Sequence, residues 1–131
     1  MTGLSFTMTT LVVPDYDEAI AYYTGTLGFA LHEDSDLGSG KRWVVVGPAS
    51  GGKLLLAKAK GEAQTRAIGN QTGGRVGFFL HTDDFEVTYN AYREKGVAFT
   101  EKPRIEPFGK VVVFTDPYGN LWDLIEEAET A

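Results

Sequence analysis

The two halves of the chain carry the same succession of sequence patterns, and this internal repeat limits the possible folds more than any other feature. Asp15 and Asp84 each open a helical pattern, 69 residues apart. Three consecutive valines at residues 44–46 recur at residues 111–113, an offset of 67 residues. Similar elements at a near-constant offset are typical of a duplicated structural unit. We therefore expect two copies of one module.

Each repeat contains one helical pattern near its start. Asp15 stands at a typical N-cap position, with Glu18 three residues further on. Apolar residues then follow the spacing of one helical face as far as Gly28, which favours a helix end. The second half repeats this arrangement between Asp84 and Gly96. The sequence thus predicts one helix in each repeat.

Runs rich in β-branched and aromatic residues predict one strand before each helix and three strands after it. The residues from 60 to 74 lack an apolar period and contain several glycines, so we expect them to form a connecting loop. The prediction is a single domain over residues 1–131, with module 1 at 4–59 and module 2 at 75–126. The expected strands cover residues 4–13, 29–35, 42–47, 53–59, 75–82, 98–106, 110–115 and 121–126.

Composition excludes several classes of function. A chain of 131 residues is long enough to bury a core, and without Cys it has neither a disulfide framework nor a thiolate nucleophile. A formal net charge of −6 repels a phosphate backbone and an anionic bilayer, so nucleic acid and membrane are not expected partners. No signal-peptide pattern opens the sequence, and cytoplasmic residence is the default expectation.

Two motifs resemble a known family. Residues 12–23, VVPDYDEAIAYY, and residues 114–124, FTDPYGNLWDL, are similar to those of the vicinal oxygen chelate superfamily. That group includes glyoxalases, extradiol dioxygenases, fosfomycin-resistance transferases and bleomycin-resistance proteins. The resemblance implies an α+β fold of two tandem βαβββ modules, the glyoxalase-like fold, with curved mixed sheets around an open cleft. It also implies a homodimer, since a partner chain often completes the cleft in such proteins.

The resemblance further implies a divalent metal held by the first and last strand of each module. The family pattern and the repeat place the four ligand positions at Met8, Leu56, Gly77 and Asp123. Only Asp123 offers a hard donor, whereas such ions need about three protein ligands. We therefore expect no metal and no other cofactor. The remaining alternative is a rearranged site that uses the only two histidines, His32 and His81, or His32 with the acidic residues after it.

His81 and Asp123 are the candidate catalytic residues, and each has a structural alternative. His81 shares a predicted strand face with Gly77 and Phe79 and could act as a general base. Alternatively, it hydrogen-bonds to the helix start or to a neighbouring strand. Asp123 could contact a ligand or take a proton, or it could be a vestige of the metal site that now serves a structural hydrogen bond.

Loss of the metal ligands predicts an apolar cleft that is widened at Gly77 and suited to a flat or hydrophobic small molecule. The leading hypothesis is a small-molecule binding protein of the glyoxalase/bleomycin-resistance type. The alternative is a glyoxalase-like or dioxygenase-like enzyme that uses His81 and Asp123 or a nonstandard metal site, and a third is a partner-binding module without a small ligand. The expected ligand-binding residues are Phe6, Met8, Arg42, Trp43, Leu56, Gln71, Gly77 and Phe79.

Overall fold

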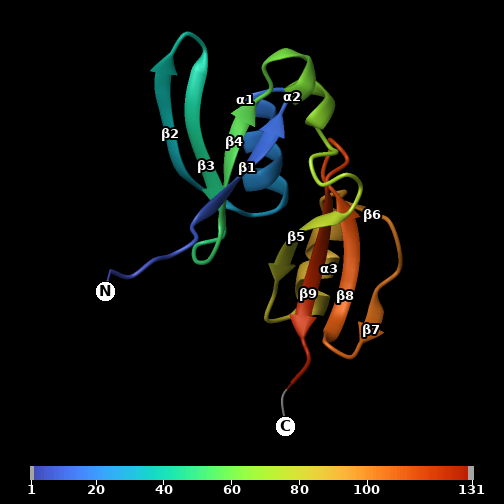
Figure 1. Ribbon diagram of the computed structural model, residues 1–131. Coiled ribbons are helices and arrows are strands. Elements are labelled where there is room, and N and C mark those ends of the chain that lie inside the picture. The colour runs from blue at the N-terminus through green and yellow to red at the C-terminus, as the bar shows by residue number, and fades with distance from the viewer. Residues whose placement is uncertain (1, 130–131) are drawn as a thin grey trace. The chain divides into compact units, whose positions relative to one another are not determined.

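The first half of the chain forms a four-stranded sheet with a helix on one face. A computed structural model describes residues 2–129, and the chain divides into two compact units at Ile68 and Gly69 (Figure 1). In unit 1 the strands have the order β1-β4-β3-β2, and only β1 and β4 run parallel. The elements of this unit are β1 (Met8–Val13), α1 (Tyr16–Ile20), the π-helical η1 (Ala21–Thr26), β2 (Ala30–Gly38), β3 (Lys41–Gly47), β4 (Lys53–Lys58) and α2 (Gly61–Ala67).

The second half repeats this arrangement, as the sequence predicts. In unit 2 the order is β5-β9-β8-β6, with β7 also paired to β8, and only β5 and β9 run parallel. The elements are β5 (Val76–His81), α3 (Phe85–Glu94), β6 (Ala98–Phe99), β7 (Arg104–Glu106), β8 (Gly109–Thr115) and β9 (Leu121–Glu127). The expected α+β fold is confirmed.

The two predicted helix starts are confirmed by their caps. The Asp15 carboxylate accepts a hydrogen bond from the Glu18 amide at 2.8 Å, and the Asp84 carboxylate accepts one from the Val87 amide at 3.2 Å. The first helix widens into η1 after one turn. Its Thr24 hydroxyl donates to the carbonyl of Ile20 at 2.7 Å, where it competes with the ordinary α-helical bond.

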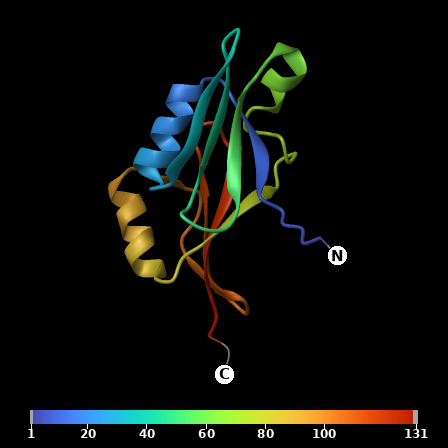
Figure 2. The same cartoon turned by 90° about the vertical axis from the view of Figure 1, so that its left-hand side faces the viewer.

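Each unit buries one face of its sheet against its own helix, and Figure 2 shows the two helices against their sheets. Because side chains alternate along a strand, the other residues of each strand lie on the opposite face. In unit 2 we call the face away from α3 the helix-free face. The buried side chains between sheet and helix include Leu11, Val44, Val46, Leu56, Ala19 and Tyr23 in unit 1, and Val112, Phe114, Trp122, Leu124, Phe85 and Tyr92 in unit 2.

The first strand is shorter than predicted. It begins at Met8 rather than at residue 4, since its parallel pairing starts where Met8 meets Lys53, the first residue of β4. Leu4 and Phe6 precede the sheet and are 98% and 89% exposed. Phe6, predicted to share a strand face with Met8, therefore lies outside the strand.

Two other predicted segments differ from the structure. The strand expected over residues 98–106 is divided into β6 and β7. Pro103 has no amide hydrogen to donate, and the Glu101 carboxylate accepts the hydrogen bond of the Val113 amide at 3.1 Å. The loop expected over residues 60–74 contains α2, which the Gln64 side chain caps by accepting from the Lys60 amide at 2.8 Å. No residue of α2 is buried, so its sequence shows no apolar period.

Candidate functional site

Asp123 lies in the middle of the helix-free face of unit 2. It is on β9, where its register partners are Phe79 of β5 and Val113 of β8. The neighbouring residues of the same strand, Trp122 and Leu124, are buried on the α3 side. Residues paired directly across a sheet point to the same side, so Asp123 has an aromatic and an aliphatic side chain as its immediate neighbours.

The carboxyl group of Asp123 has an oxygen atom that is buried without a hydrogen-bond donor in the described part of the chain. Its Oδ1 atom is buried and accepts no hydrogen bond within residues 2–129. Burial raises the pKa of this carboxyl group; Arg104 opposes the change and Glu101 adds to it. A buried acceptor without a donor is uncommon in native proteins and calls for a specific explanation. The site can therefore satisfy a hydrogen-bond donor, and it favours a proton or another cation.

A charged cluster borders Asp123 on the same sheet. The Arg104 Nε atom lies 2.9 Å from the Glu101 carboxylate, and its Nη1 atom lies 3.1 Å from the Glu106 carboxylate. Arg104 pairs in register with Val111, two residues before Val113, which places the guanidinium group on the side of Asp123. Two carboxylates thus already neutralise Arg104. The sequence analysis did not single out this cluster, although Glu101, Arg104 and Glu106 all lie within the strand predicted over residues 98–106.

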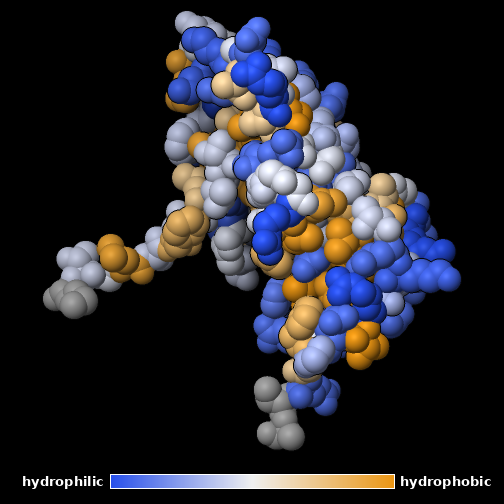
Figure 3. Space-filling model, turned by 45° about the vertical axis from the view of Figure 1, so that its right-hand side comes forward, coloured by the Kyte–Doolittle hydropathy of each residue, from blue (hydrophilic) through white to orange (hydrophobic). Residues whose placement is uncertain are grey.

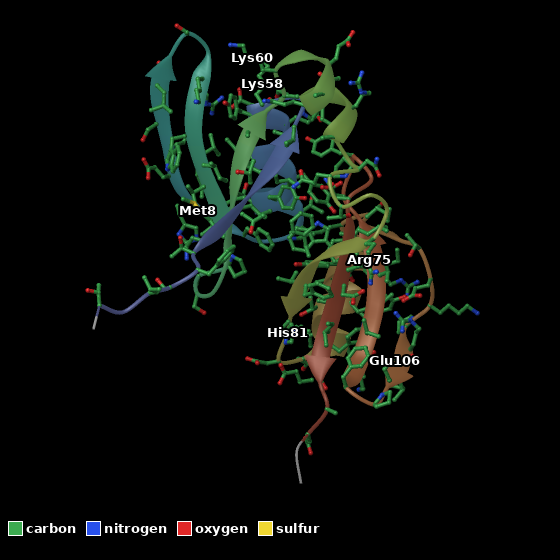
Figure 4. The ribbon with its side chains drawn as sticks, in the orientation of Figure 1. Met8, Lys58, Lys60, Arg75, His81 and Glu106 are labelled. Carbon is green, nitrogen blue, oxygen red and sulfur yellow. The ribbon has the colours of Figure 1, made fainter. Side chains whose placement is uncertain are left out.

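His81 lies on the same face but is directed to another partner. Its Nδ1 atom is 3.1 Å from Glu127 of the adjacent strand β9, and both side chains are largely exposed. Figure 4 shows His81 at the end of β5 and Glu106 on β7, near opposite edges of the sheet. A contact with a neighbouring strand is what the structural interpretation of His81 expects. His81 pairs in register with Ile125, two residues along β9 from Asp123, and the catalytic role of the two residues stays a prediction.

Phe79 and Gly77 differ in what surrounds them. Phe79 is 61% exposed and so presents its ring beside Asp123. Gly77 lies in a bulge between Val76 and Phe78, which interrupts the strand alternation that the sequence assumed. A Cβ atom on Gly77 would overlap the methyl group of Thr72. The pocket predicted to be wider at Gly77 is therefore filled by Thr72.

Leu56, predicted as the counterpart of Asp123, faces the helix of unit 1. It is 1% exposed and pairs with Leu11 and Val44, which are fully buried. Its neighbour Leu55 lies on the opposite face and occupies the register position in its sheet that Asp123 occupies in the other. The predicted counterpart was thus wrong by one residue. Leu55 has no donor atom either.

Arg42 is engaged in structural contacts. Its guanidinium group donates to Asp34 at 3.1 and 2.7 Å and to Asp17 at 3.0 Å, and it lies 5.1 Å from the ring centroid of Tyr16. These contacts join the hairpin of β2 and β3 to α1. Arg42 also lines a cavity in this hairpin together with Asp34, Asp36 and residues 38–40. Its role in ligand binding stays a prediction.

The remaining predicted ligand residues lie in different places. Trp43, next to Arg42 on β3, points to the opposite face and is half-buried, and half-buried Met8 begins β1. Gln71 is half-buried in the turns between α2 and β5. The structure thus groups Phe79, His81 and Asp123 on one sheet face, whereas Met8 and Trp43 belong to the other unit.

The donor atoms do not fit the divalent metal that the fold implies. Met8 offers only a thioether, Leu55 and Gly77 offer no side-chain donor, and Asp123 is a single carboxylate. No group of three or more His, Asp or Glu side chains suited to a metal occurs in the described part of the chain. His32, the basis of the alternative site, directs its Nε2 atom to the carbonyl groups of Gly47 and Pro48 at 3.2 and 3.1 Å.

The surface of unit 2 combines apolar and charged groups. Figure 3 shows hydrophobic side chains in orange among hydrophilic ones in blue on this unit. Four large hydrophobic residues are well exposed among the described residues of this unit, namely Phe79, Val87, Ile105 and Phe108, at 61%, 64%, 77% and 52%. Exposed large hydrophobic groups often mark surfaces that bind a ligand or a partner.

Comparison with known proteins identifies the family. The model of the Glyoxalase/Bleomycin resistance protein/Dioxygenase superfamily matches residues 5–124, and the chain therefore belongs to this superfamily. An uncharacterized protein of Shewanella frigidimarina (strain NCIMB 400) is 50% identical over 119 residues, which are 88% of each chain. These matches confirm the resemblance inferred from the two motifs.

Solved structures agree with this assignment. The crystal structure of UcmS2 is similar with a TM-score of 0.81 and 31% identity, covering 95% of this chain and 98% of that one. TnmS3, an antibiotic binding protein from Streptomyces sp. CB03234, is similar with a TM-score of 0.77 and 27% identity, covering 98% and 100%. Among the described residues, no helix is long and apolar enough to cross a membrane.

Proposed function

We propose that this protein binds a small organic molecule without covalent chemistry, on the helix-free face of unit 2, and that it does so without a metal ion. The observation that carries the proposal is the buried Oδ1 atom of Asp123, which has no donor within residues 2–129. A ligand that donates a hydrogen bond there would remove the cost of this unsatisfied acceptor.

The surroundings of Asp123 favour a ligand with an apolar body. Phe79 is 61% exposed on one side of Asp123, and Val113 lies on the other. Removal of apolar surface from water contributes roughly 25 cal/mol per Å², so a flat aromatic molecule on Phe79 would gain affinity without many polar contacts. Similarity to the antibiotic binding protein TnmS3 supports antibiotics as the ligand class.

The metal-free part of the proposal follows from the donor set. A single carboxylate and a thioether on separate sheets do not meet the ligand requirement of a catalytic divalent ion. Treatment with EDTA is therefore expected to leave ligand affinity unchanged. Elemental analysis of protein purified without chelator should find less than one ion per chain, and a stoichiometric ion whose removal abolished binding would contradict this part of the proposal.

Binding itself is tested with a neutral aromatic probe, 1-naphthalenemethanol, followed by the amide NMR signals of the 131-residue chain. We expect saturable shifts at the amides of Phe79, Val113 and Asp123. Phe79→Ala should weaken binding several-fold through the loss of contact area. Val87→Ala is the matched control, since Val87 is similarly exposed at 64% but lies on α3. No saturable shift, or equal losses in the two variants, would refute the proposed site.

A further inference from the structure

We propose that the natural ligand carries a protonated amine that lies against Asp123, with its apolar body on Phe79. This inference rests on the proposed function and adds the chemical class of the ligand. Its starting point is the uneven sharing of charge among four neighbouring ionisable side chains of unit 2. They are Glu101, Arg104, Glu106 and Asp123.

The only cation of this group is already paired twice. Glu101 contacts the Nε atom of Arg104 at 2.9 Å, and Glu106 contacts its Nη1 atom at 3.1 Å. Asp123 interacts with Arg104 only through space and has no hydrogen bond to its buried Oδ1 atom. With three carboxylates and one guanidinium group, the ionised cluster carries an excess negative charge. An anionic ligand would be repelled by it.

An ammonium group fits this position better than a metal ion does. It supplies up to three N–H donors and one positive charge, and a charge-assisted hydrogen bond to one carboxylate is enough to orient it. A divalent metal would require further ligands that the chain does not offer here. The amine would thus satisfy both the missing donor and the missing charge at Asp123.

The exposed ring of Phe79 also favours a cationic ligand. It pairs in register with Asp123 on the adjacent strand, and its ring is 61% exposed. An aromatic face attracts a cation within about 6 Å of its centroid. The aromatic body of an amine can also lie on this ring while its nitrogen reaches the carboxylate. Carboxylate and ring together select a cationic aromatic or alkyl amine.

The inference predicts a pH dependence with a definite sign. Burial raises the pKa of Asp123, so at acidic pH a fraction of the protein molecules carries a proton on this carboxyl group. In those molecules a cation must displace the proton before it can bind to the ionised form. The affinity for an amine should therefore rise as the pH increases from 4 to 7. Other ionisable groups face this region, namely Arg104, Glu101, Glu106, His81 and Glu127, and the Asp123→Asn variant separates their effect from that of Asp123.

Three probes of similar shape test the inference by calorimetry on the full chain: 1-naphthylmethylamine, 1-naphthalenemethanol and 1-naphthoate. We expect the cationic amine to bind at least about tenfold more tightly than the neutral alcohol. The anionic naphthoate should bind most weakly. Equal binding of amine and alcohol would overturn the inference and leave the proposed function intact. Failure of all three probes to bind would count against the proposed function itself.

Two variants locate the effect. Asp123→Asn should reduce the affinity for the amine by about tenfold and abolish the rise with pH, whereas the affinity for the alcohol should fall by a smaller factor, because the Asn carbonyl still accepts a hydrogen bond but carries no charge. Glu86→Gln is the matched control, because it removes one exposed carboxylate on α3, the opposite side of the same sheet. An amine affinity that falls equally in both variants would reflect net charge alone and would overturn the assignment to Asp123.

Discussion

Asp116 and Asp123 bury their carboxyl groups in opposite ways. Asp116 is 4% exposed, and its Oδ1 atom accepts from the amides of Tyr118 and Asn120 at 3.0 and 2.9 Å. Its Oδ2 atom accepts from the Asn120 side chain at 2.7 Å. These bonds close the turn between β8 and β9. By contrast, the Oδ1 atom of Asp123 has no such donor within the described residues. The first carboxyl group stabilises the fold, whereas the second keeps an unsatisfied acceptor.

Replacement of Asp116 should therefore destabilise the folded chain. Asp116→Ala leaves three donors without their acceptor, and we expect the free energy of unfolding to fall by about 3 kcal/mol or more. Urea denaturation followed by circular dichroism measures this loss. Asp83→Ala, at an exposed position, should change stability by less than about 0.5 kcal/mol. A loss below about 1 kcal/mol for Asp116→Ala would contradict the role given to the turn.

Asp123→Asn, by contrast, should increase the free energy of unfolding at neutral pH. The pKa of Asp123 is raised by burial, so the folded chain holds this proton more tightly than the unfolded chain does. Wild-type stability therefore decreases as the pH rises from the ordinary aspartate pKa of about 3.9 through the raised value. We expect the variant to unfold at higher urea concentration at pH 7, and the difference to disappear near pH 4. A variant less stable at pH 7 would show that Asp123 has a structural role.

Among the larger elements, the segment before β5 covers the start of that strand. The Thr72 hydroxyl donates to the carbonyl of Arg75 at 2.6 Å, and its methyl group occupies the space next to Gly77. The bulge at Gly77 and the turns around Thr72 therefore form one packed corner. Any side chain at position 77 has to displace that methyl group.

This corner gives a double-mutant test. Gly77→Ala should destabilise the chain by about 1–3 kcal/mol because the added methyl group overlaps Thr72. Thr72→Ser removes the obstructing methyl group and keeps the hydroxyl, so the double variant should recover part of the loss. Thermal unfolding of the four proteins measures the coupling between the two sites. Additive losses would mean that the two residues do not touch.

The sequence predicts the elements of this fold better than their faces. Both helix starts were predictable because an N-cap depends on a few adjacent residues, as at Asp15 and Asp84. The equivalence of the two valine runs was wrong by one residue: Val45 corresponds in register to Val113, an offset of 68 rather than 67. One residue exchanges the two faces of a strand, and this explains why Leu56 was chosen instead of Leu55.

Parts of the candidate site could not be predicted because they depend on strand pairing. Arg104 reaches the side of Asp123 only because β7 pairs with β8 in the observed register. The Thr72 contact with Gly77 likewise requires the folded corner. Asp123 itself was predictable from the family motif, although its missing hydrogen bond was not.

For the whole molecule, we propose that the homodimer implied by the family resemblance is the functional form. Large hydrophobic side chains such as Phe6, Ile105 and Phe108 are more than half exposed in the single chain, which favours association. Light scattering after size-exclusion chromatography should give twice the chain mass of 14.3 kDa. A concentration-independent mass of one chain would contradict this proposal.

The Glu101 carboxylate has two functions, and this has a consequence for redesign of the protein. One of its oxygen atoms accepts hydrogen bonds from both Arg104 and the main-chain amide of Val113, at 2.9 and 3.1 Å. Here a side chain replaces the missing backbone partner of β8, between β6 and β7. Attempts to alter the selectivity of the proposed ligand site by changing Glu101 would also loosen this border of the sheet. Substitutions at Phe79, which has no part in that junction, are therefore the better choice.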